Sequence, residues 1–413
     1  MRDFTNLALF FVIFFTACGQ EKPKQRQSAK TASQTVRNNI AVGKGPDALF
    51  LTPDEDYLYV ANVGDTFISV IATGTDRVVQ TIDGTDYPWG FTRLGETNLV
   101  AVSGYDKGVD LIDFTTHKIV KPKRYEQNLG GIASTKDGKT LFVVATGANK
   151  VLKIDANSLE ILDDYDTGNG PDGVGISKDD SKIYVTNTKD GTISVINLNT
   201  KKAEVIKTGG KPELIHYNHD HSLLYISNFV ENKIHILDTG TDKIVHEITG
   251  LDGPEEAVLS ESGKMLYVVN FNSSKVFSYD AKTYEKLPQE FSVGTKPIGV
   301  VSAANDSKLY VSNYGDNAVS AIQVPSSSPK ISEQSGKTSP LEILVKFKPG
   351  VEESQVKAME SEIGLKQVKA IPELNLRVFK IASGKSLQQV LEACQKMPFV
   401  EYAEPNQTYR TQK

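Results

Sequence analysis

The chain repeats itself seven times with a period close to 42 residues. Each copy begins with a two-residue turn before a short β-rich run, and the second turn residue stands at position 46, 88, 129, 171, 212, 254 or 297. The successive spacings are 42, 41, 42, 41, 42 and 43 residues. So regular a period indicates a repeat architecture in which each copy is one supersecondary unit.

Each copy contains four segments with the composition of β-strands. The second segment is the most distinctive, with the sequences LYVAN (58–62), LVAVS (99–103), LFVVA (141–145), IYVTN (183–187), LYISN (224–228), LYVVN (266–270) and LYVSN (309–313). A third β-rich run follows, and then a more polar fourth run such as Arg77–Ile82 or Lys243–Ile248. Valine, isoleucine and tyrosine suit a buried pleated sheet, and four strands in about 42 residues are typical of one β-propeller blade.

These second strands resemble the repeats of the YVTN family of bacterial seven-bladed β-propellers. The resemblance covers about residues 40–324 and implies a seven-bladed propeller over 36–324. Copies two and three depart from the pattern, because their second strands do not end in asparagine. The last copy ends at Val324 after its third strand, so we predict that Val36–Val42 supplies the fourth strand and closes the ring.

A different module follows the Ser/Pro/Lys-rich stretch 325–340, whose composition is typical of a linker. The predicted elements alternate as strand, helix, strand, strand, helix, strand, over Leu341–Phe347, Val351–Ile363, Leu365–Ala370, Leu374–Ile381, Ser386–Lys396 and Phe399–Pro405. That order is the ferredoxin-like βαββαβ arrangement. The sequence therefore predicts a mainly-β chain in which a small α+β domain, 341–413, follows the propeller.

Three segments of this module, VKFKPGV (345–351), PELNLRVFKI (372–381) and FVEYAEPN (399–406), resemble the fervidolysin-like N-terminal prodomain of subtilisin-like proteases. In that family the residues after the last strand enter the protease cleft, which would be the place of Gln407–Lys413. The chain has no G-x-S-x-G nucleophile motif, so it is not itself such a protease. Two interpretations stay open: a trans-acting inhibitor or docking factor for a separate subtilisin-like protease, or a reused interaction domain.

The N-terminal segment predicts export. Arg2 precedes a run of nine apolar residues, Leu7–Phe15, which is too short to span a bilayer and typical of a signal peptide. Thr16-Ala17-Cys18 resembles the lipobox of bacterial lipoproteins, which implies cleavage before Cys18 and lipidation of its thiol. We expect a signal peptide (1–17), a lipidated disordered tether (18–35) and attachment of the chain to an envelope bilayer, at the outer membrane or cell surface. The alternative is an ordinary secretory signal with an incidental cysteine.

Composition excludes several classes of function. The 413 residues carry 46 basic and 51 acidic side chains, and the net charge of −5 argues against a nucleic-acid binder. Two cysteines exclude a disulfide scaffold and a four-cysteine metal site. His216, His219 and His221 could together bind a divalent metal, but we interpret them as residues of a surface turn. We predict no cofactor and no metal.

Propellers usually bind ligands at one mouth of the central channel. The residue after the turn marker lies there, and supplies the predicted ligand-binding residues Asp47, Trp89, Asp172, Glu213 and Glu255. The facing loops add Tyr105, Phe229, Phe271 and Tyr314, together with the acids Asp65, Asp190, Glu231 and Asp316. An acidic mouth with an aromatic rim suits a cationic group, a basic peptide or a metal ion. The alternative is that these carboxylates cap backbone N–H groups.

These features predict an envelope-anchored binding protein that recognises a peptide, protein or small ligand at the propeller mouth, without catalysis. YVTN repeats are also similar to those of lactonase-type propellers, which act on small cyclic esters. No catalytic residue of that class can be transferred to this chain, so a lactonase-like hydrolase is the enzymatic alternative.

Overall fold

The computed structural model describes residues 38–303, 306–324, 342–372, 375–381, 390–391, 393–394 and 396–405. The chain divides into two compact units, Met1–Ser328 and Pro329–Lys413. The predicted signal peptide (1–17), Cys18, the tether (18–35), the linker (325–340) and Gln407–Lys413 lie outside the described residues. No helix in the described ranges is long and apolar enough to cross a membrane.

The described part of the first unit forms seven four-stranded antiparallel sheets. The innermost strands are β2 (Pro46–Leu51), β6 (Pro88–Arg93), β10 (Leu129–Ser134), β14 (Pro171–Ile176), β18 (Pro212–Tyr217), β22 (Pro254–Leu259) and β26 (Pro297–Ala303). The second strands are β3 (Tyr57–Asn62), β7 (Leu99–Gly104), β11 (Thr140–Ala145), β15 (Lys182–Asn187), β19 (Leu223–Asn228), β23 (Met265–Asn270) and β27 (Lys308–Asn313).

The outer half of each sheet contains two further strands. The third strands are β4 (Phe67–Ala72), β8 (Gly108–Asp113), β12 (Lys150–Asp155), β16 (Thr192–Asn197), β20 (Lys233–Asp238), β24 (Lys275–Asp280) and β28 (Ala318–Gln323). The outermost strands are β5 (Arg77–Asp83), β9 (Lys118–Arg124), β13 (Ile161–Asp166), β17 (Ala203–Lys207), β21 (Lys243–Ile248) and β25 (Lys286–Ser292). The seventh sheet takes its outermost strand, β1 (Asn38–Ala41), from the start of the unit.

Burial explains why the second strands have such continuous apolar sequences. In every sheet the last five residues of the second strand are buried, because neighbouring sheets cover both of its faces. The outermost strands are largely exposed, as β17 illustrates, and their sequences are accordingly more polar.

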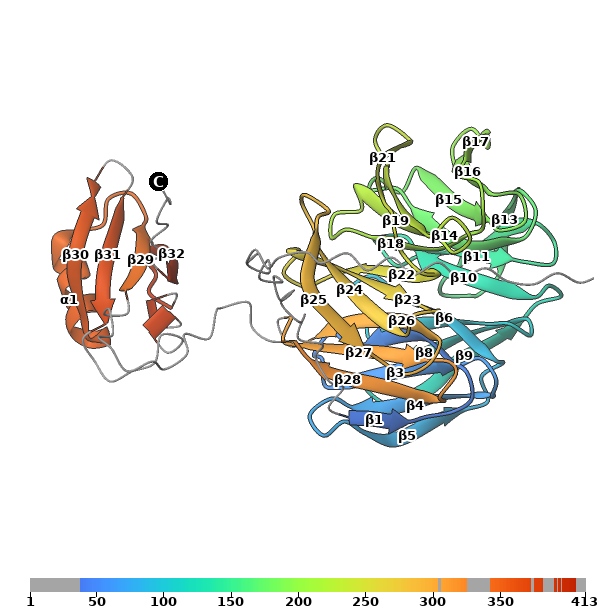
Figure 1. Ribbon diagram of the computed structural model, residues 1–413, viewed down its shortest axis with the longest axis horizontal. Helices are drawn as coiled ribbons and strands as arrows, with labels where there is room; N and C mark the ends of the chain where they lie inside the picture. Colours follow the sequence, from blue (N-terminus) through green and yellow to red (C-terminus); the bar gives the residue numbers. More distant parts are fainter. Residues whose placement is uncertain are drawn as a thin grey trace, which may run out of the picture. The chain divides into compact units, whose positions relative to one another are not determined.

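The sheets succeed one another around a closed ring. Each innermost strand contacts the innermost strand of the next sheet, and β26 of the last sheet contacts β2 of the first. In Figure 1 the orange strands of the last sheet thus return to the blue strands of the first. The first unit is therefore a β-propeller, which confirms the predicted mainly-β class.

The ring is completed by a strand from the other end of the unit. β1 pairs antiparallel with β28, and Ile40 lies opposite Val319. This pairing confirms the predicted closing strand over its described residues. It leaves the third strand of the last sheet without an exposed edge.

The second unit contains one four-stranded sheet in the order β30-β31-β29-β32. Its elements are β29 (Glu342–Phe347), α1 (Glu353–Ile363), β30 (Leu365–Ile371), β31 (Leu376–Ile381) and β32 (Val400–Pro405). Val356, Met359 and Ile363 of α1 pack with Ile343 and Phe379 of the sheet in one apolar core. Most of the predicted second helix, Ser386–Lys396, lies outside the described residues, although residues 390–391 and 393–394 are helical.

Candidate functional site

The start of each innermost strand places its first side chains at the central channel. In six of the seven sheets the pairing between the first and second strands shifts register just after the proline, as between Pro46 and Leu49. Such β-bulges redirect side chains at the end of a strand. Asp47, Asp172 and Glu255 are partly exposed at this position, and Glu213 is 7% exposed.

The four predicted carboxylates lie close enough to repel one another. Burial raises the pKa of Asp47 to about 8, with further contributions from Glu256, Asp172 and Glu213. Burial also raises the pKa of Glu255 to about 9, and Glu213 and Asp47 raise it further. Burial and Glu213 raise the pKa of Asp172 to about 6. The structure therefore brings Asp47, Asp172, Glu213 and Glu255 into one cluster, which we call the acidic mouth.

Lys211 is the cation nearest to this cluster. Its ammonium pairs with Oε1 of Glu213 and lies 5.7 Å from the ring centroid of Phe229. The Lys211 charge also opposes the rise in the pKa values of Asp172 and Glu255. Oε2 of Glu213 is buried and has no hydrogen-bond partner among the described residues. One lysine thus serves a cluster of four carboxylates.

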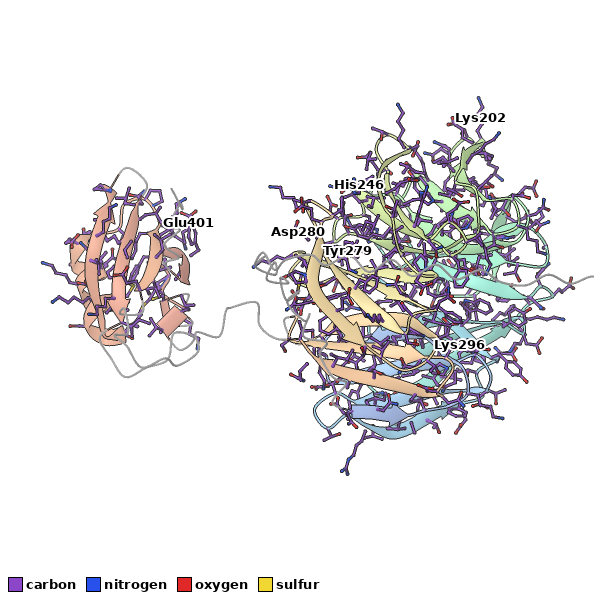
Figure 2. The ribbon with its side chains drawn as sticks, in the orientation of Figure 1. Lys202, His246, Tyr279, Asp280, Lys296 and Glu401 are labelled. Atoms are coloured by element: carbon purple, nitrogen blue, oxygen red, sulfur yellow. The ribbon has the colours of Figure 1, made fainter. Side chains whose placement is uncertain are left out.

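Aromatic side chains flank the acidic mouth in two pairs. Trp89 and Tyr105 stack with their centroids 5.4 Å apart, and Phe229 meets Phe271 edge-on at 5.7 Å. The ammonium of Lys296, labelled in Figure 2, lies 6.0 Å from the Phe271 centroid. These contacts join residues of innermost strands and of the loops that follow the second strands, as the sequence predicted.

Tyr314 packs over the turn before β2. A Cβ added to Gly45 would come within 2.9 Å of Cε2 of Tyr314, and the φ of Gly45 is +58°. Glycine is therefore required here both for the left-handed backbone and for the close approach of the ring. The Tyr314 side chain is 42% exposed, so it could still contact a ligand.

The acids of the loops after the second strands have a structural role. Asp65 accepts a hydrogen bond from the Lys44 N–H at 2.6 Å. Asp190 and Asp316 accept equivalent bonds from Asn169 at 2.7 Å and Thr295 at 2.8 Å. These three carboxylates cap backbone donors, so the alternative stated above holds for them. Glu231 is exposed, and its own N–H donates to Asn228 Oδ1 at 3.2 Å.

A cavity of about 360 Å³ lies among the innermost strands. Asp47 and Trp89 line it, together with His216 and Glu256. Between these polar groups the wall is apolar, formed by Leu49, Phe91, Ile132, Val174 and Ile215 among others. Its volume lies within the usual range for small-molecule sites.

Two charged residues of the cavity wall were missed by the sequence analysis. Nε2 of His216 lies 2.6 Å from Oε1 of Glu256, and Oε2 of Glu256 accepts a hydrogen bond from the Val300 N–H. His216 belongs to β18, so its assignment to a surface turn was wrong. His219 is exposed in that turn, whereas His221 stacks on Tyr217 at 4.2 Å and also lines the cavity. Within the described residues no group of three potential ligands could hold a metal ion.

Comparisons with known proteins match both units. A family model described as a YNCE-like beta-propeller matches residues 95–203, and one described as the fervidolysin N-terminal prodomain matches residues 327–406. No curated protein matches the chain.

Among solved structures, the chain is similar to "Kuenenia stuttgartiensis Hydrazine Synthase" with a TM-score of 0.59 and 19% identity over 68% of this chain and 96% of that one. It is also similar to the "Myceliophteria_thermophila Cps50 (Swd1) beta-propeller domain", with a TM-score of 0.59 and 10% identity over 70% of this chain and 99% of that one. At these identities the likeness shows the propeller fold alone.

Proposed function

We propose that this chain is an envelope-anchored binding protein whose propeller takes a positively charged group at the acidic mouth. The observation that carries the proposal is the clustering of Asp47, Asp172, Glu213 and Glu255 around a single lysine. The ligand is a peptide, a protein or a small molecule that presents an ammonium or guanidinium group.

The electrostatics of the mouth favour such a ligand. Burial and mutual repulsion raise the pKa values of the carboxylates, so the free protein holds protons there near neutral pH. An arriving cation replaces those protons and relieves the repulsion. The ring of Phe229 already has a cation near it in Lys211, and the stacked Trp89–Tyr105 pair offers a second aromatic surface to a cationic ligand.

The same proposal includes the finer architecture. The seven sheets of the first unit are the blades of a seven-bladed propeller of the YVTN type. The sheet order of the second unit, with α1 between β29 and β30, supports a ferredoxin-like βαββαβ domain.

Envelope attachment follows from the lipobox-like Thr16-Ala17-Cys18 segment. We propose that the acylated Cys18 inserts its chains into a bilayer of the outer membrane or cell surface, and that residues 18–35 tether the propeller. Metabolic labelling with a palmitate analogue tests this, because a Cys18→Ser variant should lose both the label and the membrane fraction.

Binding of a lysine-rich peptide tests the acidic mouth. We expect the wild-type chain to bind it in low salt, and the double variant Asp172→Asn/Glu213→Gln to bind it at least about tenfold more weakly. Glu204→Gln, an exposed carboxylate on β17, is the matched control for a change of charge elsewhere. Equal binding by the double variant and the wild type would overturn the proposal.

A second candidate function rests on the prodomain match to residues 327–406. The second unit would inhibit or dock a separate subtilisin-like protease. Titration of a purified subtilisin-like protease with the full chain, and with a chain lacking Gln407–Lys413, tests this idea. Inhibition that depends on this tail supports insertion into the cleft, whereas absence of inhibition at tens of micromolar contradicts an inhibitory role.

A further inference from the structure

We propose that the cavity among the innermost strands is a second subsite for the same ligand, in which His216, oriented by Glu256, donates a hydrogen bond to a carboxylate. The ligand class is then a small zwitterion, with its cation at the acidic mouth and its carboxylate within the channel. This inference rests on the proposed function and specifies the chemistry of the other end of the ligand.

The first argument is that the repeat is broken at this place. The second residue after the turn marker is alanine or glycine in five copies: Ala48, Gly90, Gly131, Gly173 and Gly299. A Cβ at Gly131, Gly173 or Gly299 would lie 2.4–2.6 Å from a carbonyl oxygen of the next innermost strand, so the strands approach too closely for a side chain. The two exceptions are Leu214 and Glu256, on the adjacent strands β18 and β22.

The second argument is the way in which Glu256 holds the imidazole. Its carboxylate is 7% exposed as a residue and spans three consecutive innermost strands, from His216 on β18 to the Val300 N–H on β26. Both of its oxygens are therefore occupied. A carboxylate in this position fixes the ring orientation and keeps a proton on Nε2.

The remaining nitrogen of His216 is available to a ligand. Nδ1 has no hydrogen-bond partner within the described residues, and the side chain is 34% exposed although its strand lies at the centre of the ring. That exposure is to the cavity, because His216 is one of the residues that line it.

Charge decides what this nitrogen binds. Burial opposes protonation of the imidazole, but the Glu256 charge and its hydrogen bond outweigh burial, so the pKa of His216 is raised. A protonated ring presents Nδ1–H as a donor, which suits an acceptor group on the ligand. A carboxylate is the strongest such acceptor and forms a charge-assisted hydrogen bond.

Spacing along β18 sets the length of the ligand. Glu213 at the acidic mouth and His216 stand three residues apart on one strand, a rise of about 10 Å. Ile215, Ile132 and Val174 form part of the wall beside this segment. An extended apolar chain with an ammonium at one end and a carboxylate at the other matches that arrangement.

Calorimetric titration with 8-aminooctanoate, octylamine and octanoate tests the inference. We expect the wild-type chain to bind 8-aminooctanoate about tenfold more tightly than octylamine, and octanoate more weakly than either. His216→Gln should bind 8-aminooctanoate and octylamine equally, with the octylamine affinity unchanged. The ratio of the two affinities is informative because a general loss of folded protein lowers both titrations alike.

Further variants separate the two proposals. Asp172→Asn/Glu213→Gln should lose both ligands, and Glu256→Gln should lower the preference for the zwitterion. If octylamine binds but the carboxylate adds nothing, or if His216→Gln keeps the full preference, the subsite is overturned while the acidic mouth stands. If neither amine binds the wild type, both proposals fail.

Discussion

The phenolic hydroxyl of Tyr310 donates a hydrogen bond of 2.7 Å to Oδ1 of Asp76, a residue 234 positions earlier in the chain. Lys308 forms an ion pair with the same carboxylate at 2.5 Å. Tyr310 belongs to the last sheet and Asp76 to the first, so the contact joins the two ends of the ring. Tyr184 and Asp242 make the equivalent bond at 2.5 Å between the fourth and fifth sheets. The closing seam is thus built like a seam within the repeat.

Replacing Tyr310 with phenylalanine tests the strength of this closing contact. We expect Tyr310→Phe to lower the free energy of unfolding by about 1–2 kcal/mol, because a buried donor to a carboxylate is lost while the ring still packs. Tyr314→Phe is the matched control, since the Tyr314 side chain is 42% exposed. Urea unfolding gives both values, and equal stabilities of the two variants would contradict the role given to Tyr310.

The closing strand β1 should contribute more than this single bond. Ile40 is 5% exposed and packs with Leu58 and Val60 of the first sheet and Val319 of the last. We expect Ile40→Ala to cost about 2–4 kcal/mol of unfolding free energy, as for other large-to-small core changes. Ala41→Ser, an exposed change on the same strand, should cost less than about 0.5 kcal/mol. A small effect of Ile40→Ala would show that the ring is stable without its closing strand.

Much of the fold could be predicted because periodicity reports burial directly. The predicted strand Lys243–Ile248 has the bounds of β21, and the predicted helix Val351–Ile363 differs from α1 only at its start. That helix begins later because Gln355 Oε1 accepts a hydrogen bond from the Glu352 N–H, which places the N-terminal cap at Glu352. Such local capping is hard to locate from apolar spacing alone.

The site was predicted less completely, for a physical reason. Asp65 and Asp172 are both acids of the same mouth in sequence, yet Asp65 caps a backbone N–H and Asp172 belongs to the repelling cluster. Sequence spacing does not say which carboxylates have backbone donors within reach. Glu256 and His216 were missed because attention to the shared repeat hides departures from it. The signal was present, since Glu256 stands where most copies have glycine.

The thiol of Cys394 should report on the packing of the second unit. Cys394 is fully buried in its core, and burial raises the pKa of the thiol to about 11. We expect a thiol reagent to label it about a hundredfold more slowly in the native protein than in urea. A Cys18→Ser background makes the readout specific, because the chain has two cysteines. Rapid labelling without urea would show that this core opens readily.

Asp47 should destabilise the folded protein at high pH. Its pKa is about 8 in the folded protein and close to 4 when the chain is unfolded, so the folded state binds more protons between these values. The free energy of unfolding that depends on Asp47 is therefore highest below about pH 4 and falls as the pH rises to about 8.

The variant Asp47→Asn removes this titration and gives a measurable difference. We expect it to raise the melting temperature by about 2–4 °C at pH 9 and to leave it nearly unchanged at pH 5. The same variant should bind a lysine-rich peptide more weakly, because the carboxylate that destabilises the free protein is part of the acidic mouth. Wild-type binding should also release protons, which calorimetry in buffers of different ionisation enthalpy detects. A variant that is no more stable at pH 9 than the wild type would show that Asp47 has no strained charge for a cation to relieve.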